Sequence, residues 1–168
     1  MSENPFAQIV TAEITVLELR SDACTVRRIV GDLAQVRVDF PFGLDALMRQ
    51  CFRHEPPLPI ELEHAIELTE EAVMPLASRF AGPPGMVLQG EGALRIANAL
   101  QVGGIAPAVL ALDEVESLFN RLVAISQGRP VTQETLPTDL ALFASLLILR
   151  EFMHHLHFST VALQPARS

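Results

Sequence analysis

The first forty residues alternate between apolar and polar positions as β-strands do. Three stretches, 10–20, 24–30 and 33–40, are rich in β-branched residues, and the third places every second apolar side chain on one face. The turn sequences Ser21-Asp22 and Gly31-Asp32 separate them. Because each stretch is joined to the next by a tight turn, the pattern predicts an antiparallel meander of three strands.

From residue 44 onward, apolar positions recur at steps of three and four, which is typical of helices. Pro75 lacks an amide proton, so we expect the helix that approaches it to end near Met74. Asp113 and Glu116 have the spacing of a capping box, and Thr138 is expected to cap the last helix. The predicted helices cover 44–52, 59–74, 93–101, 113–128 and 138–157.

The last of these helices is apolar nearly all round in its first ten residues, so it should run through the core. Short apolar runs at 86–89 and 159–163 predict two more strands, the second returning to the sheet. The sequence thus predicts an α+β fold: an N-terminal antiparallel β-meander packed against C-terminal helices, with a central apolar helix near 138–157. No second domain boundary is visible, so 1–168 are expected to form a single domain.

Composition narrows the classes of protein that this chain can represent. Of its 168 residues, 49% are hydrophobic and 19% are charged, which is too apolar for a disordered chain. Two cysteines do not make a disulfide scaffold, and we expect Cys24 and Cys51 to be reduced structural thiols. The net charge of -8 argues against nucleic-acid binding, because phosphate contacts need a basic face.

The apolar residues also bear on location and association. The N-terminal residues show no basic segment followed by a long apolar run, and the longest apolar stretch, 140–149, is too short for a bilayer. We therefore expect a cytoplasmic protein that does not interact with membranes. The high apolar fraction leaves two interpretations, a well-filled core or an exposed apolar patch that supports self-association or a protein partner.

Six glutamates and no arginine lie from Glu55 to Glu71, and five of the six are on the predicted helix 59–74. Carboxylates three or four positions apart are neighbours on a helix and repel each other by a few tenths of a kcal/mol. The pattern is consistent with a solvated acidic face, a docking surface for a basic partner, or a metal site. The predicted partner-binding residues are Glu63, Glu67, Glu70 and Glu71.

Three of the five histidines, His154, His155 and His157, follow Glu151 at the end of the last helix. Imidazole and carboxylate together suit iron, zinc or manganese. Glu61 and His64 repeat the Glu-x-x-His spacing, and two such segments on facing helices form the ligand set of di-iron bundle proteins. The candidate metal ligands are therefore Glu151, His154, His155, His157, Glu61 and His64. The alternatives are surface or capping histidines, and a pH-sensitive cluster that faces a partner.

A glycine pair, Gly90 and Gly92, lies between a predicted strand and a predicted helix, which is typical of a phosphate-cradling turn. Position 95, where the third glycine of a dinucleotide fingerprint would stand, is Arg95, which could itself bind phosphate. Glu91 is poorly placed for an anion and could instead pair with Arg95. These residues are the candidate phosphate site.

No catalytic signature appears, so the sequence leaves open whether the chain is an enzyme. The function it favours is a non-catalytic accessory protein, adaptor-like, with the acidic helix as its docking surface. The first alternative is a metal-binding protein or metal-dependent enzyme that uses the Glu/His cluster with a divalent ion. The second is a small-molecule binder that uses the turn at Gly90–Arg95.

Overall fold

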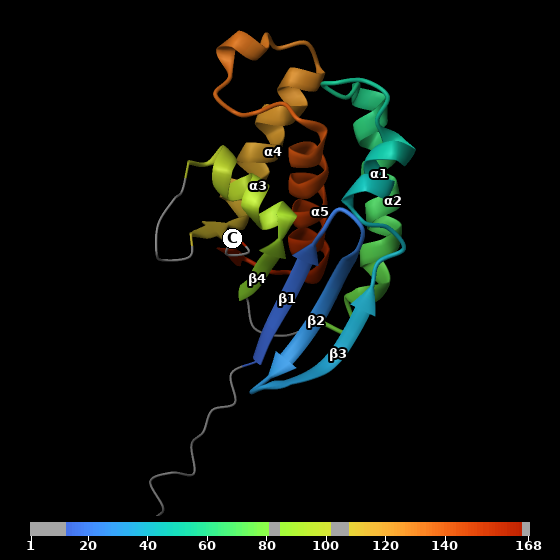
Figure 1. Cartoon of the computed structure of the whole chain (residues 1–168), viewed down its shortest axis with the longest axis vertical. Helices are drawn as coiled ribbons and strands as arrows, with labels where there is room; N and C mark the ends of the chain where they lie inside the picture. The colour runs from blue at the N-terminus through green and yellow to red at the C-terminus, as the bar shows by residue number, and fades with distance from the viewer. Residues whose placement is uncertain (1–12, 81–84, 102–107, 166–168) are drawn as a thin grey trace, which may run out of the picture.

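The structure is a computed structural model that describes residues 13–80, 85–101 and 108–165 (Figure 1). Its N-terminal strands form the predicted meander: β1 (Glu13–Leu19), β2 (Cys24–Val30) and β3 (Leu33–Asp39), each antiparallel to the next. The β2–β3 turn places Gly31 at a φ of 62°, a conformation that glycine adopts without strain. Local turn chemistry and alternation therefore determine this part of the sheet.

The other half of the sheet is built from strands that are distant in sequence. Strand β4 (Gly85–Gly90) runs parallel to β1, and β6 (Thr160–Gln164) runs parallel to β4. A short strand that the sequence pattern did not predict, β5 (Val109–Ala111), lies antiparallel to β6 at the edge. The resulting order is β3-β2-β1-β4-β6-β5.

The helices follow the predicted order and differ from the prediction mainly at their ends. They are α1 (Leu44–Cys51), α2 (Pro59–Val73), α3 (Glu91–Ala99), α4 (Leu112–Ser126) and α5 (Leu140–Leu156), with 3₁₀ turns at Met74–Leu76 and Val131–Gln133. As expected, α2 ends just before the turn that contains Pro75. The fold is α+β, with the strands of the meander first and the central helix last among the helices.

Two predicted helix caps are wrong by one or two positions. Helix α5 is capped by Asp139, whose carboxylate accepts a hydrogen bond from the backbone N–H of Leu142, and not by Thr138. In α4 it is Glu114, not Glu116, that accepts the backbone N–H of Ala111. In both helices, the carboxylate that caps is the one three residues away from the N–H group it meets.

Helix α5 forms the centre of the molecule and packs against α1, α2, α3 and α4 (Figure 1). On the sheet, Leu17, Val26, Leu88 and Leu163 stand in register across four strands and join the same core cluster as α5. The opposite face carries a polar row in which Arg27 approaches Glu18 and donates to Gln89, and Gln89 donates to Gln164. The sheet is thus apolar toward the helices, and its other side carries this polar row beside apolar positions such as Val16.

Two smaller observations complete the fold. Cys24 and Cys51 are free and buried, and burial raises the pKa of the Cys24 thiol to about 12 and raises that of Cys51 as well. Within the described residues, every helix is too short or too polar to span a lipid bilayer.

Candidate functional site

The order in which strands are added to the sheet reverses between β1 and β4. These two strands are parallel, so their carboxyl ends lie side by side along the same edge of the sheet. From β1 the chain moves to one side to build β2 and β3, and then returns through α1 and α2 to place β4 on the other side of β1. Such a reversal leaves a crevice beyond the carboxyl ends of the parallel strands, where open α/β sheets bind their ligands. The residues that follow β1 and β4 are therefore the first place to look for a site.

The turn that follows β1 is held by the start of α1. The backbone N–H groups of Leu44 and Asp45 donate to the carbonyls of Arg20 and Ser21, each at 3.0 Å. Gly43 lies so close that a Cβ atom there would be 2.5 Å from the turn backbone. No side chain fits at Gly43, so the start of α1 can pack directly against the turn and hold it in place. The side chains of the turn itself stay at the surface.

The segment that follows β4 packs directly against the end of β1. Gly90 has a φ of 84°, and a Cβ atom on it would lie 2.6 Å from the carbonyl oxygen of Leu19. Helix α3 begins at Glu91, and Gly92 packs against the Leu19 side chain. The free N–H groups of the first helical turn therefore open beside the β1–β2 turn, where they can meet an anion.

The side chains of these two segments meet across the edge. The Ser21 hydroxyl donates a short hydrogen bond to the Glu91 carboxylate, which is exposed. Arg20 pairs with Asp22 at 3.2 Å within the turn. Arg95, one helical turn after Glu91, does not pair with it as the sequence suggested; it is 3.0 Å from Asp139, the cap of α5. The edge thus combines a hydroxyl, a carboxylate and a guanidinium near a helix N-terminus.

Of the residues predicted to bind phosphate, the structure places Gly90 and Gly92 at this edge and Arg95 on the adjoining helix. Sequence reasoning missed Ser21 as a partner of Glu91. The only signal was a polar turn directly after a strand, and nothing local indicates that β1 and β4 are neighbours.

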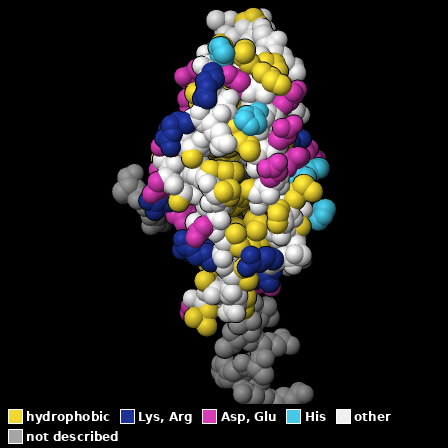
Figure 2. Space-filling view, turned by 90° about the vertical axis from the view of Figure 1, so that its right-hand side faces the viewer, with side chains coloured by type: hydrophobic (Ala, Val, Ile, Leu, Met, Phe, Trp, Pro, Cys, Tyr) yellow, Lys and Arg dark blue, Asp and Glu magenta, His cyan; other side chains and the backbone are white. Residues whose placement is uncertain are grey.

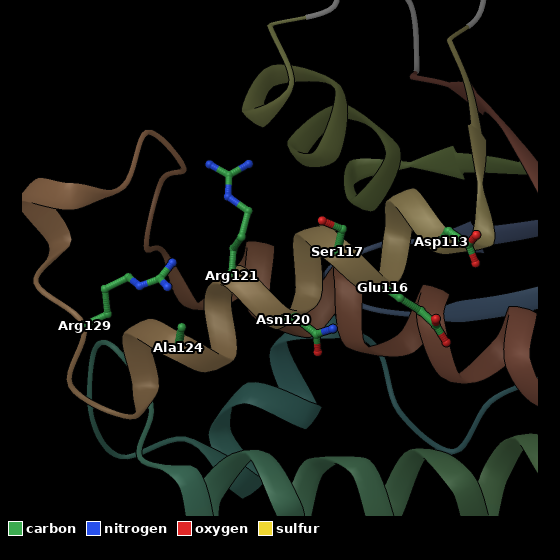
Figure 3. Close-up of a pocket in the computed structure, with 7 residues that line it drawn as sticks. All are labelled: Asp113, Glu116, Ser117, Asn120, Arg121, Ala124 and Arg129. Atoms are coloured by element: carbon green, nitrogen blue, oxygen red, sulfur yellow. The ribbon is translucent and has the colours of Figure 1, made fainter.

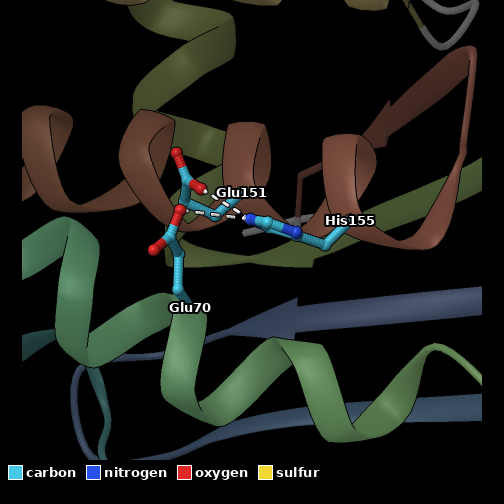
Figure 4. Close-up of side chains that lie close together, drawn as sticks. All are labelled: Glu70, Glu151 and His155. Atoms are coloured by element: carbon cyan, nitrogen blue, oxygen red, sulfur yellow. Dashed lines mark hydrogen bonds and ion pairs between the residues drawn. The ribbon is translucent and has the colours of Figure 1, made fainter.

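A second charged cluster joins α2 to α5 (Figure 4). The Nε2 atom of His155 is 3.2 Å from Oε2 of Glu151 and 3.3 Å from Oε1 of Glu70. Within the described chain, this is the one group of three metal-ligating side chains whose ligand atoms all lie within 4.8 Å of one another. The structure thus brings together two predicted metal ligands with a glutamate that the sequence assigned to a partner surface.

The other predicted metal ligands lie elsewhere. His154 faces Glu116 on α4, 3.9 Å away, and His157 ends α5 in a left-handed conformation with a φ of 61°. Glu61 and His64 are on the first turns of α2, and Glu61 bonds to His54. Nine residues of helix, about 14 Å, separate Glu61 from Glu70, so the two Glu-x-x-His segments do not face each other.

Two shallow hollows lie away from these clusters. One, of about 420 Å³, follows the outer side of α4, where Figure 3 shows Arg121 pointing away from Asn120 and Glu116. Arg121 is already engaged by three hydrogen bonds to Glu134, and this pairing lowers the pKa of the Glu134 carboxyl. The other hollow, of about 370 Å³, lies between Cys51 and the first turns of α2.

The predicted docking residues divide between the two sides of α2. Glu63, Glu67 and Glu71 are exposed and form no ion pair within the described residues, whereas Glu70 turns toward α5. Figure 2, which shows the molecule from the α1 and α2 side, has acidic and histidine side chains intermixed. Two glutamates of α2, Glu61 and Glu70, therefore contact imidazole groups of the same fold.

Comparison with known proteins gives a fold but no sequence relative. No protein-family model matches the chain, and no curated protein matches it. Among solved structures, the Aquifex aeolicus Ppx/GppA phosphatase, type II variant, is similar with a TM-score of 0.73 at 14% identity, over 95% of this chain and 55% of that one. An exopolyphosphatase from Cytophaga hutchinsonii has a TM-score of 0.67 at 10% identity, over 94% of this chain and 55% of that one. The chain thus spans about half the length of these structures.

This comparison overturns the predicted function. The proteins that share the fold are described as a phosphatase and an exopolyphosphatase, which are enzymes, so the expectation of a non-catalytic adaptor that docks through the acidic helix is wrong. The expectation that the role of the chain is limited to protein binding is wrong for the same reason. The charge pattern misled because an exposed acidic helix is also common on enzymes, so it does not indicate function by itself.

Proposed function

We propose that this chain is a phosphatase-type domain that hydrolyses the phosphoanhydride bonds of inorganic polyphosphate at the edge where β1 and β4 end. The observation that carries the proposal is the contact of the Ser21 hydroxyl with the Glu91 carboxylate at this edge. It is supported by the fold, which is similar to that of phosphatases over 95% of the chain.

The edge offers groups that favour a phosphate chain. The N-terminus of α3 presents unpaired N–H groups, and the glycines before and within its first turn let a ligand approach the backbone. Arg95 is exposed and one turn further along α3, where its guanidinium can leave Asp139 and bind two phosphate oxygens. Arg20 adds a second cationic group at the turn.

Glu91 is the group that would act on the reacting atoms. Its carboxylate accepts a proton from a water molecule, while the Ser21 hydroxyl orients the carboxylate. The water oxygen attacks the terminal phosphorus, and the bond from that phosphorus to the bridging oxygen breaks. The bridging oxygen keeps the electron pair, so the products are orthophosphate and a polyphosphate that is one unit shorter.

Orthophosphate release from polyphosphate, measured with magnesium present, tests this proposal. The Glu91→Gln variant removes the base but keeps the size of the side chain, and we expect the rate to fall by about 100-fold or more. Arg95→Gln should raise KM more than it lowers kcat, because Arg95 binds substrate. The matched control is Glu63→Gln, an exposed carboxylate on α2, which should leave the rate unchanged.

Two results would contradict the proposal. One is the absence of polyphosphate-dependent orthophosphate release by the wild-type chain. The other is a Glu91→Gln variant that retains the wild-type rate while folding normally by circular dichroism.

A further inference from the structure

We propose that Glu70, Glu151 and His155 form a structural binding site for a divalent transition metal, with zinc as the preferred ion. The site ties the end of α2 to the end of α5. It does not rest on the proposed phosphatase function, since Asp139 and His155 lie at opposite ends of α5, about 24 Å apart along the helix axis.

Two of the three distances between the ligand atoms match a tetrahedral zinc, and the third, between the two carboxylates, is within 4.8 Å. Zinc binds imidazole nitrogen and carboxylate oxygen at about 2.0–2.2 Å, which gives about 3.3 Å between two ligand atoms of a tetrahedron. The His155 nitrogen is 3.2 and 3.3 Å from the two carboxylate oxygens. One ion can therefore contact all three side chains with little movement of either helix.

The ligands are also held in place by their surroundings. Glu151 has only 2% of its side chain exposed, and its Oε1 atom accepts a short hydrogen bond from Arg150, while its Oε2 atom faces His155. The Arg150 guanidinium is itself fixed over the Phe119 ring, 5.3 Å from its centre. Partners of this kind, which orient a ligating carboxylate, are a regular part of metal sites.

Charge and access favour an ion. The two carboxylates bring two negative charges together, and Arg150 pairs with only one of them. Glu70 and His155 are partly exposed, at 39% and 23% of the side chain, so an ion can enter and keep a water as its fourth ligand. His155 and Glu151 are four residues apart on one helix, and Glu70 completes the set from the other.

Zinc binding by the full chain, measured by competition with a chromophoric chelator, tests the inference. We expect one equivalent of zinc to bind the wild-type chain, and the affinity to fall by about 100-fold in Glu70→Gln and in His155→Ala. The matched control is His154→Ala, which removes a neighbouring imidazole that faces Glu116, and should bind as the wild type does. Zinc should also raise Tm in the wild type and the control but in neither ligand variant.

Three outcomes would overturn the inference. They are the absence of stoichiometric zinc binding, equal losses in His154→Ala and His155→Ala, and wild-type affinity in Glu70→Gln. Glu70 is partly exposed, so Glu70→Gln is expected to fold even if a change at the buried Glu151 does not.

Discussion

The glutamates of α2 fall into two groups that differ in their exposure to solvent and in their contacts with the rest of the fold. Glu61 and Glu70 turn toward the rest of the fold, where His54 and His155 meet them. The outer three, Glu63, Glu67 and Glu71, face solvent. In the sequence the two groups look alike, because a helical spacing of three or four does not say which residues face inward.

The comparison shows that carboxylates on one helix can have different roles. Glu61 is buried and accepts hydrogen bonds from the backbone N–H groups of Arg53 and Leu58 as well as meeting His54. It fixes the loop before α2 to the first helical turn. The outer glutamates contribute charge and helix propensity, so they should contribute little to stability.

The largest expected effect is that of Glu61→Ala. This change leaves two backbone N–H groups and an imidazole without their acceptor, so we expect the free energy of unfolding to fall by about 2 kcal/mol. Urea denaturation of the variant and the wild type measures it. A loss below about 0.5 kcal/mol would place Glu61 with the outer glutamates.

The contribution of Glu61 should also depend on pH. Burial favours the neutral acid, but hydrogen bonds from His54, Leu58 and Arg53 outweigh it and lower the pKa of Glu61. A lowered pKa in the folded state stabilises the fold above the unfolded-state pKa, about 4.3, and this stabilisation is lost as the pH falls through the folded-state pKa.

We therefore expect the difference in unfolding free energy between the wild type and Glu61→Gln to be greatest at neutral pH and to shrink below about pH 4. Urea denaturation across that range measures the difference. A difference that stayed constant with pH would show that the charge of Glu61 is not what the fold uses.

The smallest effect is expected for the triple variant Glu63→Gln, Glu67→Gln and Glu71→Gln. It removes repulsion between side chains four residues apart, so the free energy of unfolding should change by less than about 0.5 kcal/mol, toward greater stability. Urea denaturation at low and high salt checks this, since screening should reduce the change further. A marked destabilisation would show that the outer glutamates contribute to the stability of the fold, contrary to this expectation.

A sequence pattern indicates local structure but does not identify distant contacts, and this explains how much of the fold the sequence could predict. The meander was predictable because each strand pairs with its neighbour in the chain through a recognisable turn. The parallel pairing of β1 with β4 was not, because Thr15 meets Met86 and no local pattern names a partner 71 positions away.

The residues of the candidate sites likewise divide into those that a local pattern indicates and those that only the tertiary fold brings together. Gly90, Gly92 and Arg95 came from a local motif, and Glu151 with His155 from a helical spacing. Ser21 and Glu70 required the tertiary fold, which brings the first to Glu91 and the second to His155. Residues contributed by a distant element are the ones that sequence reasoning missed.

The position of β4 in the sheet also governs how the chain can fold during synthesis. Its neighbour on one side is β6, and the apolar helix α5 that fills the core comes just before β6 in the chain, so both are synthesised well after β4. Until then β4 is an unpaired sheet edge over an open core, a state prone to aggregation. The sheet and the core of the described residues can therefore close only after α5 and β6 have been synthesised.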